Sequence, residues 1–254
     1  MNFQNKKILI TGASKGLGYV CSKTLADNCA GLVLMARSKD QLEELRQTFS
    51  NPENHLTIAT DFLDKEELIN NIKKAKDFLK NIDVILHIAG GGLGLRDPLL
   101  SSDDFEKLFL LNLKSVIEIN HLIVPDMIER KSGNVVHIGS IASNEAVASV
   151  GYNTSKAALA AYVRSLGREI ANTGVVVTGI LPGGFHAPGN AMDRLKFNKP
   201  EVYHQFIKER IPRGFMGQAE ELIPLILFLC SKEASMMGGC MVPIDGGEGV
   251  SYTF

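Results

Sequence analysis

Seven short apolar runs recur along the chain, and longer segments with a helical pattern separate them. The runs are rich in Val, Ile and Leu and occupy residues 8–10, 32–35, 56–59, 84–86, 135–138, 175–177 and 241–244. Their nearly continuous apolar character predicts strands that are buried on both faces of a sheet.

Four amphipathic segments lie between these runs, at residues 39–49, 65–79, 105–128 and 155–171. Apolar residues recur in them every three or four positions, as on one face of a helix. This alternation of strand and helix implies right-handed crossovers and a parallel sheet with helices on both faces. The predicted fold class is therefore α/β: a single-domain, Rossmann-type, doubly wound parallel sheet of seven strands, with a ligand crevice at the carboxyl ends of the strands.

A hydrophobic content of 45% is spread evenly over the 254 residues, with no sign of a linker. We therefore expect one domain over residues 1–254. Residues 182–217 are the exception, because they are rich in Gly, Pro and charge and predict a long loop with a helix inside it. Insertions of this kind usually form lids or binding loops, so residues 183–217 are predicted to be a substrate-binding loop and lid.

The charge balance, 27 basic against 28 acidic residues, gives a formal net charge of −1. This argues against the basic field that non-specific nucleic-acid binding needs and favours a small-molecule substrate. Cysteine usage shows no CxxC spacing, so neither a disulfide framework nor a metal site is expected. The four cysteines, Cys21, Cys29, Cys230 and Cys240, are interpreted as thiols in the reducing cytoplasm. The longest apolar run, residues 222–230, is far below the roughly 20 residues that cross a membrane.

A glycine-rich turn follows the first predicted strand and leads directly into a helix, with the sequence Thr-Gly-Ala-Ser-Lys-Gly-Leu-Gly at residues 11–18. Glycines let the backbone approach a pyrophosphate, whose charge then lies at the positive end of the helix. An ordinary strand-to-helix turn is the alternative. The turn predicts that a dinucleotide cofactor is bound by Gly12, Ser14, Lys15, Gly16, Leu17 and Gly18.

The end of the second predicted strand indicates which dinucleotide fits. An acidic residue there would bind the ribose hydroxyls and repel a 2′-phosphate, but the sequence reads Met-Ala-Arg-Ser at residues 35–38. Arg37 offers a planar fork suited to phosphate, and Lys15 supplies a second cation. Each could instead be a solvated surface charge. Together they predict NADP(H) as the cofactor.

Tyr152 and Lys156 are four residues apart at the start of a predicted helix, so their side chains share a face. A nearby ammonium favours the phenolate and is expected to lower the pKa of the tyrosine, which suits a general acid and base. The alternative is a core tyrosine near a surface lysine. Because Ser140 follows a strand at its carboxyl end, its hydroxyl can hold the same substrate oxygen as Tyr152.

Asn112 is a polar residue in the strongly apolar stretch 109–113. When buried, such a residue must find a hydrogen-bond partner. A structural hydrogen bond and participation in a proton path are equally compatible with this position. We therefore predict Asn112, Ser140, Tyr152 and Lys156 as the catalytic residues.

Together these motifs make the chain resemble the short-chain dehydrogenase/reductase family nearly end to end. The resemblance rests on the glycine-rich turn, Asp61, Ala89-Gly90, Asn112, Ser140, Tyr152 with Lys156, and Pro182-Gly183. It implies that Asp61 lies beside the adenine, Ala89 and Gly90 beside the adenine ribose, and Lys156 on the nicotinamide ribose, with Asn112 supporting a water-linked proton relay. The further cofactor contacts that it implies are Phe62, Tyr152, Pro182, Gly183 and Phe185.

The resemblance also suggests a homotetramer, formed through the long helices that begin near Ser101 and Ser155 and through the C-terminal strand. The apolar run at residues 222–230 is a second ground for this prediction. Two departures alter the expected cofactor contacts. His87-Ile88 stands where the family commonly has Asn-Asn, and Ala187 stands where a threonine often binds the nicotinamide carboxamide.

The closest sub-pattern is that of 3-oxoacyl-carrier-protein reductases, carried by residues 211–217 and 242–247. Lys131 fits a docking patch for a carrier protein, but Thr173 stands where such reductases tend to carry arginine. A general ketone or alcohol is therefore the first substrate hypothesis, 3-oxoacyl reduction the second, and a non-catalytic NADP(H)-sensing protein an alternative of another class. Six lid residues could serve an anionic substrate or form a solvated helix face: His186, Arg194, Lys196, Lys199, His204 and Lys208.

Overall fold

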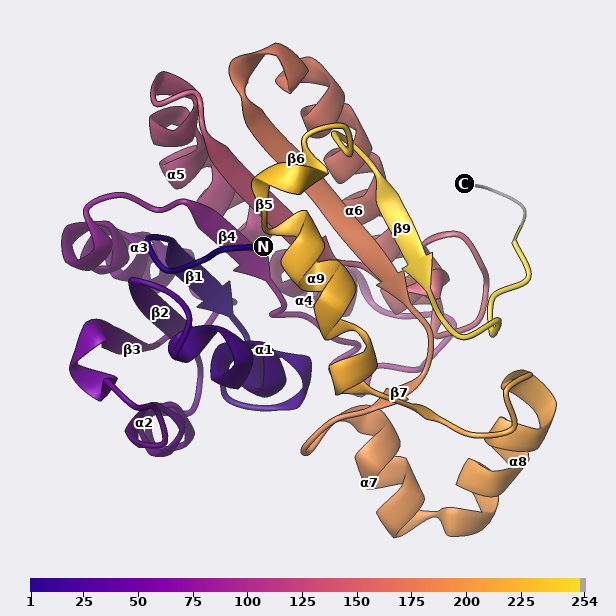
Figure 1. Ribbon diagram of the computed structural model, residues 1–254. Helices are drawn as coiled ribbons and strands as arrows, with labels where there is room; N and C mark the ends of the chain where they lie inside the picture. Colours follow the sequence, from indigo (N-terminus) through magenta and orange to yellow (C-terminus); the bar gives the residue numbers. More distant parts are fainter. Residues whose placement is uncertain (252–254) are drawn as a thin grey trace.

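A seven-stranded parallel sheet forms the centre of the molecule (Figure 1). The computed structural model describes residues 1–251. The strand order is β3-β2-β1-β4-β5-β6-β9, so the chain reverses direction along the sheet between β1 and β4. The strands are β1 Lys7–Thr11, β2 Gly31–Ala36, β3 His55–Ala59, β4 Val84–His87, β5 Gly133–Ile138, β6 Val175–Pro182 and β9 Met241–Ile244. The predicted fold class and all seven predicted strands are confirmed.

Helices cover both faces of the sheet. They are α1 Gly16–Ala26, α2 Lys39–Gln47, α3 Lys65–Leu79, α4 Ser102–Phe109, α5 Ser115–Glu129, α6 Val150–Glu169, α7 Ala191–Asn198, α8 Pro200–Arg210 and α9 Ile223–Leu229. Short 3₁₀ turns lie at Pro52–Asn54, Ile141–Ser143, Ala171–Thr173, Ala219–Glu221 and Lys232–Ala234. The helix predicted at residues 105–128 begins earlier, and a π-helical turn at Leu110–Lys114 joins α4 to α5.

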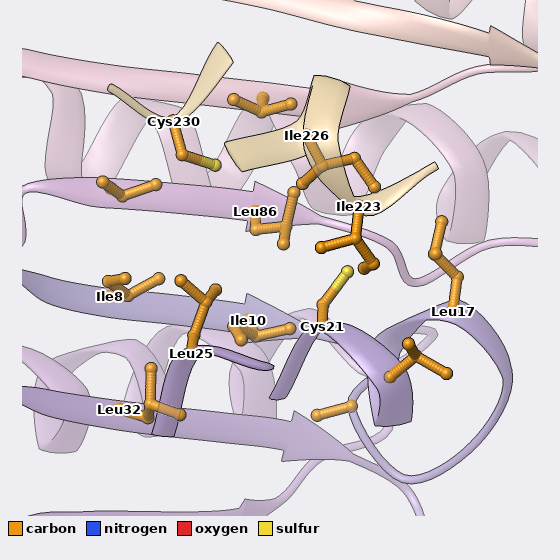
Figure 2. Packing of buried hydrophobic residues seen from close by; sticks show 14 of the residues in the cluster. Ile8, Ile10, Leu17, Cys21, Leu25, Leu32, Leu86, Ile223, Ile226 and Cys230 are labelled. Atoms are coloured by element: carbon orange, nitrogen blue, oxygen red, sulfur yellow. The ribbon is translucent and has the colours of Figure 1, made fainter. Parts of the chain in front are cut away.

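On one face, α1, α2 and α9 pack against the strands. Figure 2 shows Ile8 and Ile10 of β1 pointing toward Cys21 and Leu25 of α1, with α9 beside them. Ile223, Ile226 and Leu229 of α9 are buried in the same cluster. Much of the apolar run at residues 222–230 therefore packs in the core of this chain, while Leu225, Leu227 and Phe228 are only partly buried.

On the other face, α3, α5 and α6 bury their apolar sides against the sheet. The segment Ser102–Glu129 is long and apolar enough to span a membrane by length and composition alone, and 44% of its most apolar window is buried. Val116, Ile119 and Ile123 pack into the cluster on this face of the sheet, as expected for the core helix of a globular protein.

The segment predicted to be a lid, residues 183–217 and called the lid below, leaves the sheet after β6 and returns before α9. Its helices α7 and α8 lie outside the sheet layers (Figure 1). One helix was predicted in this segment, but it contains two, because Asn198 ends α7 and Pro200 starts α8. Two short strands, β7 Phe185–His186 and β8 Gly217–Gln218, pair in parallel where the lid begins and ends.

Candidate active site

The predicted catalytic residues lie at the carboxyl ends of the central strands. Ser140 directly follows β5 and begins a 3₁₀ turn, where its Oγ accepts a hydrogen bond of 3.1 Å from the Ala142 N–H. Tyr152 lies in the first turn of α6, and the Ser140 side chain is close enough to its phenol to favour the ionised form. Two hydroxyls from different elements thus lie near each other, an arrangement that can hold a single substrate oxygen.

Burial raises the pKa of Tyr152, and the Ser140 side chain opposes this rise. The predicted lowering by a neighbouring ammonium was therefore wrong for the protein without ligand. The physical reason is desolvation, which disfavours the phenolate more than the polar neighbour favours it. Tyr152 is consequently a protonated donor at neutral pH.

Lys156 lies one turn further along α6 and is only 4% exposed. Its Nζ donates a hydrogen bond of 2.8 Å to the Ile138 carbonyl and lies 5.8 Å from the centroid of the Tyr152 ring. Burial lowers the pKa of Lys156 to about 8. The alternative interpretation of a surface lysine is wrong, because the ammonium is held inside the site beneath the tyrosine.

Asn112 is buried in the π-helical turn, where the helix bulges toward the end of β4. Its Oδ1 accepts from the Gly91 N–H at 2.9 Å, and its Nδ2 donates to the Gly91 and Leu108 carbonyls at 3.0 and 2.9 Å. A Cβ at Gly90 would lie 2.8 Å from Oδ1 of Asn112 and 3.3 Å from Nζ of Lys156. The structural interpretation of Asn112 is thus satisfied, since it fixes the loop that lies against Lys156.

The glycine-rich turn packs tightly against the loop after β4. Gly12 has φ +70°, and a Cβ there would lie 2.7 Å from the Ala89 nitrogen. A Cβ at Gly18 would lie 2.1 Å from the Gly12 carbonyl oxygen. The Thr11 Oγ1 accepts hydrogen bonds of 3.1 Å from the N–H groups of Ile88 and Ala89. The turn and Ala89 therefore form one cradle with no room for side chains.

Lys15 and Arg37 are both exposed at the same edge of the sheet, since β1 and β2 are neighbours in parallel register. Within residues 1–251, neither side chain makes a hydrogen bond or an ion pair. Ser14 lies in the same turn and is partly exposed. Two unpaired cations beside the cradle are suited to bind an anion from solvent.

The remaining predicted cofactor residues lie around the same edge. Asp61 follows β3, and its Oδ1 accepts a hydrogen bond of 3.0 Å from the Leu63 N–H. The side chain of Phe62 is buried in the core. The others are Leu17 in the core beneath the turn, Pro182 at the end of β6, Gly183 directly after it, and Phe185 in β7.

In both departures from the family pattern, at His87 and at Ala187, the side chain is buried, while Ile88 is partly buried. His87 stacks on His137 with ring centroids 4.8 Å apart, and its Nε2 lies 2.9 Å from Oδ1 of Asn120. Burial lowers the pKa of His87 to about 4, so the ring is neutral. Ala187 is 5% exposed within the core cluster of α1. These residues pack inside the protein rather than offering polar groups to a cofactor.

His186 does not belong to a solvated helix face. Its Nδ1 lies 3.0 Å from Oδ1 of Asp193 and its Nε2 lies 2.7 Å from the Tyr203 hydroxyl, so the ring joins β7 to both lid helices. Tyr203 also belongs to a small apolar cluster inside the lid, with Ile211 and Met216. The other five predicted cations are exposed: Arg194, Lys196, Lys199, His204 and Lys208.

Three charged residues near this site were not predicted: Glu145, Arg210 and Glu248. Glu248 is buried, and its carboxylate accepts from the Gly184 N–H and pairs with Arg210 at 3.1 Å. Burial raises the pKa of Glu248, against the opposing effects of the Gly184 N–H and Arg210. The sequence signal for Glu248 was an acidic residue among glycines near the C-terminus, and this pattern does not identify the residue that pairs with it.

Comparison with known proteins identifies the family. A family model described as "short chain dehydrogenase" matches residues 6–196. The 3-oxoacyl-[acyl-carrier-protein] reductase of Thermotoga maritima is 28% identical over 252 residues, which is 97% of this chain and 99% of the relative. Gluconate 5-dehydrogenase of Gluconobacter oxydans is 28% identical over 96% of this chain and 95% of its own. The structure of L-sorbose reductase from Gluconobacter frateurii has the same fold, with a TM-score of 0.89, 24% identity and 99% coverage of both chains. The chain belongs to the short chain dehydrogenase family and is an oxidoreductase.

Proposed function

We propose that the protein transfers a hydride between NADP(H) and a ketone or secondary alcohol, with Tyr152 as the general acid and base. The observation that carries this proposal is the buried Lys156, whose Nζ lies 5.8 Å from the centroid of the Tyr152 ring and donates to the Ile138 carbonyl, two residues before Ser140. Neither an ordinary core tyrosine nor a chance spacing of tyrosine and lysine requires a serine hydroxyl and a buried ammonium at the same point.

The residues at the strand ends fit a dinucleotide cofactor. The glycines at positions 12 and 18 let the turn pack directly on backbone atoms that any Cβ would meet, and the start of α1 offers backbone N–H groups to a pyrophosphate. When bound, the nicotinamide donates or accepts the hydride. The residues that we assign to cofactor binding are Gly12, Ser14, Lys15, Gly16, Leu17, Gly18, Arg37, Asp61, Phe62, Ala89, Gly90, Tyr152, Lys156, Pro182, Gly183 and Phe185.

The protein's own groups handle the proton. Tyr152 is protonated at neutral pH, so it donates to the carbonyl oxygen during reduction, while Ser140 holds that oxygen by a hydrogen bond. Lys156 brings positive charge close to the tyrosine, which stabilises the phenolate left behind. In the oxidative direction, the same phenolate accepts the proton of the alcohol. Asn112 supports this machinery by fixing the loop at Gly90 and Gly91.

The choice between the two nicotinamide dinucleotides rests on Lys15 and Arg37. Proteins of this fold hold either one, since the L-sorbose reductase structure contains NADPH and a 7α-hydroxysteroid dehydrogenase structure contains NADH. Two unpaired cations at the adenosine end favour a 2′-phosphate. Arg37→Asp should therefore reverse the preference, and binding titrations of the variant with both cofactors test this. Equal affinity for both cofactors in the unmodified protein would exclude the proposal.

The substrate is proposed as a general ketone or secondary alcohol, and 3-oxoacyl reduction is the second candidate. The carrier-protein reductase of Thermotoga maritima supports the second candidate, and gluconate 5-dehydrogenase supports the first. A panel of diketones, keto-sugars and a 3-oxoacyl thioester, followed through nicotinamide absorbance, separates them. Tight NADPH binding with no turnover on any member would favour the sensing protein instead.

We further propose a homotetramer in the cytoplasm, as the family resemblance suggests. Apolar side chains along α4 and α5 support a contact between subunits, since they are only partly covered in one chain. These residues are Phe105, Phe109, Leu110, Leu113 and Ile117. Light scattering at micromolar concentration tests the oligomeric state. Four free cysteines suit the reducing cytoplasm.

A further inference from the structure

Glu248 follows the C-terminal strand β9 and is buried, with a side chain that is 4% exposed. A turn held by Asp245 positions it, because the Asp245 carboxylate accepts from the N–H groups of Gly247 and Gly249 at 2.9 and 3.1 Å. A buried carboxylate is costly unless hydrogen bonds and an opposite charge satisfy it. The groups that satisfy this one show which parts of the protein it joins.

The two oxygens of Glu248 bind opposite ends of the lid. Oε2 accepts from the Gly184 N–H at 2.5 Å, directly after the lid leaves β6. Oε1 pairs with Nη2 of Arg210 at 3.1 Å, at the last residue of α8. One side chain therefore closes the loop of 25 residues that lies between Gly184 and Arg210 in the sequence.

The same contacts reach the segment between the two catalytic hydroxyls. Nη1 of Arg210 donates to the Val147 carbonyl at 3.4 Å. Oε1 of Glu145 accepts from the Val250 N–H at 2.8 Å, two residues after Glu248. Asn153, next to Tyr152, donates to the Glu145 carbonyl at 2.9 Å. The lid ends, the C-terminal segment and the loop that separates Ser140 from Tyr152 are thus connected through charged groups.

We propose that Glu248 is a positioning residue, which clamps both ends of the lid against the loop between Ser140 and Tyr152 and so sets the substrate pocket. It touches neither reacting group and acts through Gly184, Arg210 and Val147. The role in turnover rests on the proposed function. The role in lid closure does not, and it is measured separately.

The test uses Glu248→Gln, which keeps the size of the side chain and an oxygen for the Gly184 N–H but removes the charge. Because the charged interaction with Arg210 is lost, we expect KM for the carbonyl substrate to rise about tenfold with a smaller change in kcat. Backbone amides of α7 and α8 should exchange with deuterium about tenfold faster. Arg210→Met should give the same result, and the double variant should be no worse than the worse single one.

Arg213→Met is the matched control. Arg213 forms a 2.8 Å ion pair with Glu221 at the end of the lid, and within residues 1–251 it makes no ion pair with Glu248. Its substitution should leave KM and lid exchange within about twofold of the unmodified protein, as for a surface pair. The proposal is overturned if Glu248→Gln and Arg210→Met exchange at the unmodified rate in α7 and α8. If Glu248→Gln fails to fold, Arg210→Met and Arg210→Lys decide, and the lysine variant should restore part of the protection. A protein without turnover on any substrate would refute the proposed function, while lid exchange would still decide the clamp.

Discussion

The glycine-rich turn and the lid touch where the Gly16 N–H donates to the Pro188 carbonyl at 2.8 Å, yet the two regions are stabilised in different ways. The turn stands on β1 and β2, whose residues are almost all inaccessible to solvent. The lid buries a small apolar cluster of its own and leaves Phe197 and Val202 exposed, at 89% and 53%. The proposed cofactor side is thus fixed by packing of the main core, and the proposed substrate side by a small cluster and individual polar contacts.

The largest effect should come from Tyr152→Phe, because the proposed proton donor belongs to the well-packed part of the protein rather than to the lid. The ring and its packing survive, but the proposed proton donor is gone, so kcat should fall by about 10²–10⁴-fold. Affinity for NADPH and exchange in the lid should change little. The measurement is steady-state kinetics on the best substrate of the panel, with a binding titration as the control. Nearly full kcat in the variant would mean that another group is the acid.

Next in size is a comparison of two isoleucines. Ile8→Ala removes a fully buried side chain from β1 and should lower the free energy of unfolding by about 2–5 kcal/mol. Ile211→Ala makes the same change in the lid cluster, where the site can relax, and should cost about 1 kcal/mol. Denaturant unfolding of both variants measures the difference. Equal losses would contradict the view that the lid packs separately from the sheet.

The pH dependence of stability should reveal the buried Lys156. Its pKa is about 8 in the folded protein, while in the unfolded chain it is about 10.4, so between these values the unfolded chain binds more protons and stability rises with pH. Relative to Lys156→Met, the unmodified protein without cofactor should gain about 2 kcal/mol between pH 7 and 9.5. Keeping below pH 10 avoids ionisation of tyrosines. A constant difference between the two proteins over this range would show that the ammonium is not desolvated.

The smallest effect should come from a pair of buried tyrosine hydroxyls. Tyr203→Phe removes the 2.7 Å contact with His186 in the lid, whereas Tyr162→Phe removes a 3.1 Å hydrogen bond from Asn120 beside the sheet. Each loss is expected to cost about 1 kcal/mol. In Tyr203→Phe, amide hydrogen exchange should become faster in α7 and α8 alone. In Tyr162→Phe, it should become faster for the amides that exchange through global unfolding. Faster exchange throughout the sheet in Tyr203→Phe would break the comparison.

The parts of the fold that were predictable are those with a local signal. The strand runs are apolar because both faces of the sheet are covered, so the apolar runs alone predict where the strands lie in the sequence. The π-helical turn at Asn112 left no such signal, since a single buried amide creates it by bonding Gly91 on another element. The lid helices were merged into one because both are short, and only the Asn198 and Pro200 boundary separates them.

The same distinction holds for the site. Tyr152, Lys156 and Ser140 were predictable, because spacing along a helix and position after a strand place them together. The raised pKa of Tyr152 was not, since it depends on burial by elements distant in the sequence. The Glu248 contacts join residues 64 positions apart, and those of Glu145 join residues 105 apart. No periodicity encodes such pairs.

The short β7–β8 pairing has a consequence for engineering. Because it brings the two ends of the lid together, residues 187–216 form a cassette whose attachment points are close in space. Such cassettes can be exchanged between relatives without repacking the sheet, provided that the recipient keeps Glu248 and the incoming lid carries an arginine at position 210. Libraries aimed at new substrates are therefore best built by grafting whole lids, with the glycine-rich turn and the catalytic helix left unchanged.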